Sequence, residues 1–157
     1  MIKFEYESLI ASLDVLYQDS DLVVVNKPSG LLSVPGRGEE KFDSVETRVR
    51  QQFALGARAI HRLDMATSGI LLIAKHKAAE RHYKIQFEQR LVEKTYYAIT
   101  SGIIAPTQGS MDWPLIADWE NRPRQIVCAI RGKPALTHYQ VVQTDIVHAQ
   151  TLVRLTL

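Results

Sequence analysis

The sequence contains only one cysteine, Cys128, among 157 residues, and this scarcity excludes several classes of protein. One cysteine cannot form an internal disulfide, which favours a reducing compartment, and we expect the cytoplasm. Histidines and acidic residues form no cluster with metal-ligand spacing, so no metal is expected. Cys128 itself is interpreted as a small buried hydrophobe on a strand over 125–130, with a catalytic role as the less favoured alternative.

Long apolar runs are also missing, and charge of one sign is not in large excess. No run approaches the roughly 20 apolar residues that cross a membrane, so no membrane segment is expected. The chain has 19 basic and 17 acidic residues, a net charge of +2. Basic residues gather over 48–90 and 122–133, where they could neutralise nucleic-acid phosphates or form an ordinary solvated surface. The balance permits a polyanionic partner without requiring one.

What the sequence does have is the periodicity of short strands and two helices. A capping pair, Asp43 and Glu46, predicts the start of a helix near 43–53. Apolar residues at helical spacing predict a second helix over 77–89. Strands or extended segments are predicted over 14–18, 22–27, 31–34, 59–63, 69–75, 94–100, 125–130, 135–143 and 149–157, and an irregular segment over 113–123. Strands outnumber helices, and tight turns join several of them. The fold class is therefore α+β, a mixed, largely antiparallel sheet with flanking helices.

The segment His61-Arg62-Leu63-Asp64 carries the strongest chemical signal. Asp64 ends an extended segment and begins a polar loop, a position that exposes a side chain at the rim of a sheet. Its alternative role is that of a turn residue capping the loop. Arg62 is two residues earlier, so on an extended strand it faces the same side as Asp64. Without further information, His61 is equally consistent with a satisfied histidine and Arg62 with a surface cation.

Three motifs in order resemble the signatures of the ribosomal large subunit family of pseudouridine synthases. They are Asn-Lys-Pro-Ser-Gly-Leu over 26–31, His-Arg-Leu-Asp over 61–64 with Thr-Ser-Gly and an apolar strand over 67–75, and Lys-Thr-Tyr-Tyr-Ala over 94–98. The resemblance covers about residues 14–157. It implies a pseudouridine synthase catalytic domain over 1–157 without an S4 RNA-binding domain. The strand at 157 looks unfinished and a later arginine motif of the family is not reached, so we expect about the first two-thirds of the enzyme.

The resemblance also implies roles for individual residues. Asp64 would be the catalytic carboxylate, attacking C1′ or C6 or abstracting a proton. Tyr96 would stack on the target uracil close to the proton on C5; its alternative is a half-buried strand tyrosine, as we expect of Tyr97. Arg62 would fill the space that the extruded uridine leaves. The remaining predicted RNA-binding residues are His61, Lys27, Arg37, Asn121 and Arg122, of which Lys27 and Arg37 are expected to contact phosphates.

The implied activity is isomerisation of uridine to pseudouridine in RNA. The implied substrates are a uridine in the anticodon stem-loop of some tRNAs and one in a hairpin of large-subunit rRNA. Isomerisation gains and loses no atoms, so no cofactor is expected, and the intact enzyme is expected to be a monomer. Two alternatives stay open: a truncated, catalytically inactive RNA-binding remnant, and a piece that binds nothing because its core is incomplete and its strand edges are unpaired.

Overall fold

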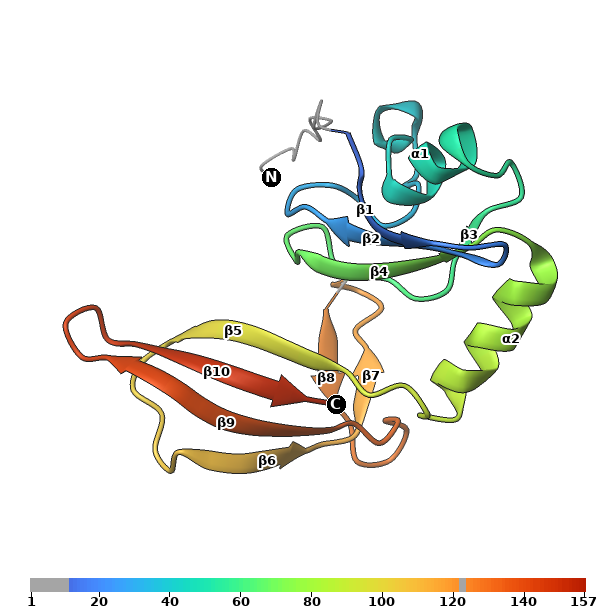
Figure 1. The fold of residues 1–157 in the computed structure, drawn as a ribbon. Coiled ribbons are helices and arrows are strands. Elements are labelled where there is room, and N and C mark those ends of the chain that lie inside the picture. The colour runs from blue at the N-terminus through green and yellow to red at the C-terminus, as the bar shows by residue number, and fades with distance from the viewer. Residues whose placement is uncertain (1–11, 122–123) are drawn as a thin grey trace. The chain divides into compact units, whose positions relative to one another are not determined.

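A computed structural model describes residues 12–121 and 124–157 of the chain (Figure 1). The described residues divide into two compact units between Leu91 and Val92. Each unit has its own sheet, and every pair of strands described is antiparallel. The α+β class with largely antiparallel sheets is confirmed. No helix in the described ranges is long and apolar enough to span a bilayer.

The first unit holds both α-helices of the described chain and a sheet of four strands in the order β1-β2-β4-β3. Its elements are β1 (Asp14–Gln18), β2 (Leu22–Lys27), the 3-10 helix η1 (Glu39–Lys41), α1 (Val45–Gln52), β3 (Arg58–Ala59), β4 (Gly69–Ala74) and α2 (Lys77–Glu88). The predicted hairpin of β1 and β2 is confirmed, as are the strand at β4 and the helix at α2.

The sheet of the first unit has a helix on each face, because residues along β2 and β4 alternate between two apolar clusters (Figure 1). Val23 and Val25 of β2 pair with Ile73 and Leu71 of β4, and these four fully buried side chains pack with α1. On the other face, Leu22 pairs with Ala74, which packs with α2. The core therefore holds most of β4 and the end of β3, and the Asp64 segment runs between these two strands.

The second unit consists of strands only, within the described residues. Its main sheet has the order β5-β10-β9-β6, and β7 and β8 form a separate hairpin. The strands are β5 (Thr95–Ser101), β6 (Gln108–Asp112), β7 (Leu115–Ala117), β8 (Gln125–Val127), β9 (Leu136–Asp145) and β10 (Gln150–Thr156). Its buried residues are Thr151 and Val153 on β10, in agreement with the predicted alternation.

The start of α1 differs from the prediction. The N-cap is Ser44, whose hydroxyl accepts from the backbone N–H of Thr47 at 3.2 Å, so the capping pair of Asp43 and Glu46 was wrong. Asp43 instead pairs with Arg48 at 2.7 Å. Glu46 turns to β3, where its carboxylate accepts from the backbone N–H of Ala59 at 2.7 Å. Glu46 thus bonds to a distant strand instead of to the backbone at the start of its own helix, as the capping pair predicts.

The second unit also differs from what the sequence predicted. The segment 113–123 is not wholly irregular, because it contains β7, and β6 was missed because its sequence QGSMD does not alternate. The strand at β8 ends at Val127. Cys128 lies in the turn that follows, where its carbonyl accepts from Gly132 N–H at 2.8 Å, and it is half-buried. Backbone N–H groups of Arg131 and Ile130 lower the pKa of its thiol.

Candidate functional site

The segment from Ile60 to Asp64 crosses from β3 to β4 and is held to β4 at its start. Ile60 N–H donates to the carbonyl of Leu72 at 3.0 Å, and Leu72 N–H donates to Nε2 of His61 at 3.3 Å. The ring of His61 also stacks on Phe87 of α2, with centroids 4.8 Å apart. His61 therefore has a structural role that anchors the segment, and RNA contact by this residue remains a prediction from the sequence.

Arg62 and Asp64 are exposed on either side of Leu63, which is buried. Exposed residues on both sides of a buried one follow the alternation expected of an extended segment. Neither side chain has a hydrogen bond or ion pair to another residue in the described part of the chain. The ammonium of Lys27 is an electrostatic neighbour of the Asp64 carboxylate. An exposed, unengaged carboxylate beside an unengaged guanidinium is available to a ligand rather than used in the fold.

The backbone around Asp64 is held by residues 27–33, here called the clamp segment. The buried hydroxyl of Ser33 donates to the carbonyl of Leu63 at 2.6 Å and accepts from its N–H at 3.0 Å. Ser29 Oγ donates to the carbonyl of Ala66 at 2.8 Å. Gly30, with a φ of 90°, donates its N–H to the carbonyl of Met65 at 2.8 Å. Residues before and after Asp64 are thus fixed, which orients its side chain without engaging the carboxylate.

Lys27 is the first residue of the clamp segment. The sequence predicted that Lys27 contacts a phosphate, and its position in the structure contradicts this prediction. Its side chain is fully buried. Its ammonium donates to the carbonyls of Pro28 at 3.0 Å, Leu31 at 2.7 Å and Met65 at 3.0 Å. Burial lowers the pKa of Lys27, while the Asp64 carboxylate raises it. An ammonium that is buried and bonded to three carbonyls cannot reach an RNA backbone. Lys27 instead supports the backbone next to Asp64 through its bond to Met65.

The other predicted residues are distributed over both units. Arg37 is exposed in the loop before η1 of the first unit. Tyr96 is half-buried on β5 of the second unit, whereas Tyr97 is 65% exposed, so the expectation that Tyr97 is half-buried was wrong. Asn121, also in the second unit, donates its side-chain amide to Asp118 at 2.9 Å.

The structure therefore brings together four of the predicted residues in the first unit: Lys27, His61, Arg62 and Asp64. Arg122 lies outside the described residues. The sequence missed Ser29 and Ser33, because a serine that bonds a distant backbone leaves no periodic or motif signal. Within the described ranges no group of three histidine, cysteine or acidic residues is arranged to hold a metal ion.

Comparisons with known proteins agree on one family. Residues 21–157 match the family model described as RNA pseudouridylate synthase. The chain is 56% identical over 131 residues to the dual-specificity RNA pseudouridine synthase RluA of Yersinia pestis, and 55% identical to that of Escherichia coli K12. These matches cover 83% of this chain but 63% and 59% of the relatives. The chain thus spans about three-fifths of their length.

Solved structures give the same result for the fold. The human RNA pseudouridylate synthase domain containing 1 superposes with a TM-score of 0.73 at 26% identity, covering 96% of this chain and 61% of the human one. The human domain containing 4 superposes with a TM-score of 0.68 at 24% identity, over 91% of this chain and 58% of the human one. The second similarity bears on the fold alone.

Proposed function

The chain belongs to the RNA pseudouridylate synthase family, and on this premise we propose that it isomerises uridine to pseudouridine in RNA with Asp64 as the catalytic carboxylate. The observation that carries the proposal is the state of Asp64. Its carboxylate is exposed and has no hydrogen bond within the described residues, while the clamp segment fixes the backbone on both sides of it. A group held in place yet unengaged is suited to meet a substrate.

The reaction breaks the bond between C1′ and N1 of uracil, rotates the base, and forms a bond between C1′ and C5. The proton on C5 leaves and N1 gains one, so atoms balance without a cofactor. A carboxylate can support this by attacking C1′, as in glycoside cleavage, or by adding to C6 of the base. Both routes require an ionised and accessible Asp64.

Arg62 is proposed to occupy the stack when the target uridine is extruded. Extrusion costs a few kcal/mol of lost stacking, and a planar guanidinium can recover part of it by stacking on neighbouring bases. The side chain is exposed, as that of Asp64 is, and has no hydrogen bond or ion pair within the described residues. Tyr96 is proposed to stack on the uracil, and Arg37, Asn121 and Arg122 to contact the RNA.

The proposed substrates are an anticodon stem-loop of tRNA and a hairpin of large-subunit rRNA. The support is the printed description of the relatives as dual-specificity RNA enzymes. Loops expose unstacked bases, so one site can accept two RNAs of similar loop shape. We further propose a cytoplasmic, monomeric protein in which the present chain supplies the first part of the catalytic domain.

The proposal is tested by tritium release. The 157-residue chain is incubated with RNA stem-loops carrying tritium at C5 of uracil, and radioactivity in the water is counted. Release is expected, because the proton on C5 must leave during isomerisation. A folded sample that binds the RNA but releases no tritium would contradict the activity of this chain and support the RNA-binding remnant.

Ser33→Ala tests whether the clamp segment positions Asp64. The change leaves the buried N–H and carbonyl of Leu63 without the hydroxyl, at a cost of about 1–3 kcal/mol in the free energy of unfolding. A displacement near 1 Å at Asp64 would also lower the single-turnover rate by up to about 100-fold.

Ser44→Ala is the matched control, since Ser44 is a buried serine that caps α1. It is expected to cost about 1 kcal/mol of stability and to keep the rate. Thermal melting and single-turnover tritium release measure the two effects. Equal rates for Ser33→Ala and Ser44→Ala would show that Ser33 only stabilises the fold.

A further inference from the structure

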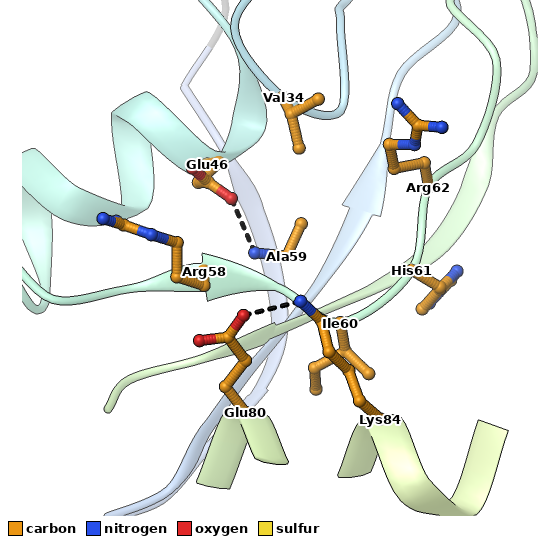
Figure 2. A pocket seen from close by; sticks show the side chains of 9 residues that line it. All are labelled: Val34, Glu46, Arg58, Ala59, Ile60, His61, Arg62, Glu80 and Lys84. Carbon is orange, nitrogen blue, oxygen red and sulfur yellow. Dashed lines mark hydrogen bonds and ion pairs between the residues drawn. The ribbon is translucent and has the colours of Figure 1, made fainter. Parts of the chain in front are cut away.

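A pocket of about 430 Å³ opens beside β3 and the Ile60–Arg62 segment, entirely within the first unit. Its charged lining comes from three elements and the crossing segment: Glu46 of α1, Arg58 of β3, Arg62, and Glu80 and Lys84 of α2. Figure 2 shows these side chains around the opening. The pocket includes Arg62, so it adjoins the proposed catalytic segment without containing Asp64.

The two carboxylates in the lining are already engaged. Glu46 is buried and pairs with Arg50 through one oxygen. Its other oxygen accepts from Ala59 N–H (Figure 2). Glu80 pairs with Lys84 at 2.6 Å (Figure 2). Glu46 thereby joins α1 to β3, and each carboxylate is paired with a cation of its own helix, which leaves little negative charge for a ligand.

The two arginines in the lining have no carboxylate partner among the described residues. Arg58 uses one nitrogen, Nη1, to donate to the carbonyl of Ala57 at 2.9 Å, which leaves most of its five N–H groups unengaged. Arg62 is exposed with no such bond at all. The pocket thus presents a surplus of positive charge and of hydrogen-bond donors.

We propose that this pocket binds a phosphate of the RNA backbone next to the target uridine, with Arg58 as its main ligand; the inference rests on the proposed function. A phosphate offers only acceptors, and a guanidinium can contact two of its oxygens at once. A base edge would also need free acceptors in the protein. Glu46 and Nε2 of His61 already accept from backbone N–H groups, so a phosphate fits the unengaged groups better.

A phosphate held in the pocket would fix the position of the RNA backbone relative to Arg62. Arg58 lies on β3, whose position is set by the bond from Ala59 to Glu46 and by pairing with β4. Arg58, the proposed ligand of the phosphate, is thus attached to a hydrogen-bonded strand rather than to a loop. A backbone contact carries no sequence information, and it sets the register of the RNA.

The test is the salt dependence of RNA binding. A fluorescein-labelled stem-loop with the target uridine is titrated with wild type, Arg58→Gln and Arg81→Gln at several KCl concentrations. Arg81 is an exposed arginine of α2 outside the pocket, so its variant removes the same charge elsewhere in the unit. Arg58→Gln is expected to weaken binding about tenfold and to lower the slope of log Kd against log [KCl] by about 0.7–0.9.

Arg81→Gln is expected to have a clearly smaller effect on both quantities. Arg58→Lys keeps the positive charge but cannot contact two phosphate oxygens at once. It is therefore expected to keep the wild-type salt slope while losing this double contact. If Arg58→Gln and Arg81→Gln behave alike while wild type binds and releases tritium, the pocket assignment is overturned and the proposed function stands. If binding depends on Arg58 but no tritium is released, the activity fails and the pocket stands. Failure of wild type to bind overturns both.

Discussion

Asp64→Asn is expected to release no tritium from C5-labelled RNA and to melt at nearly the same temperature as wild type. An amide of the same shape cannot act as a carboxylate nucleophile, and removal of a catalytic nucleophile typically lowers the rate by 10⁴-fold or more. The side chain is exposed and has no hydrogen bond within the described residues, so its loss is expected to change the free energy of unfolding by less than about 0.5 kcal/mol.

Two further measurements make this prediction specific. RNA binding by Asp64→Asn is expected to be at least as tight as by wild type, because one negative charge is removed beside a polyanion. Asp112→Asn removes an exposed carboxylate of β6 in the second unit and is expected to keep the rate. Retention of the wild-type rate by Asp64→Asn would exclude the carboxylate from the chemistry, whatever the binding data show.

Much of the first unit could be predicted from the sequence because its pattern reports burial directly. Apolar runs at β2 and β4 and helical spacing at α2 reflect side chains that pack in the two clusters. Alternation at β10 likewise predicted which face of that strand is buried. Neither β6 nor β7 gave such a signal, since β6 is polar and β7 has only three residues, and each forms through pairing with another strand.

The sequence predicted the exposed residues of the candidate site but not the contacts that hold them. Asp64 and Arg62 lie in one motif, and their shared exposure follows from alternation along an extended segment. The contacts that hold them are long-range: Ser33 bonds Leu63 across 30 positions, and Lys27 bonds Met65 across 38. Sequence spacing does not reveal whether a basic side chain points to solvent or to carbonyl groups folded over it. Lys27 was therefore placed on the RNA side, and the structure shows it in the interior.

Lys27→Met is expected to lower the free energy of unfolding by about 2–5 kcal/mol. Methionine fills a similar volume but cannot donate, so the carbonyls of Pro28 and Leu31 lose the ammonium as donor in a buried place. Each unsatisfied buried polar group costs about 1–3 kcal/mol. Urea unfolding measures the loss. Lys77→Met, at the exposed start of α2, is the matched control and is expected to stay within about 0.5 kcal/mol of wild type.

The same variant is expected to slow catalysis without abolishing it. Lys27 also bonds the carbonyl of Met65, the residue after Asp64, but that carbonyl keeps the N–H of Gly30 as a second donor at 2.8 Å. The loop should therefore loosen rather than detach, and single-turnover tritium release well below the melting temperature should fall by about 10- to 100-fold. A variant with wild-type stability would mean that the ammonium does not hold these carbonyls. A destabilised variant with the wild-type rate would mean that Ser33, Ser29 and Gly30 suffice to position Asp64.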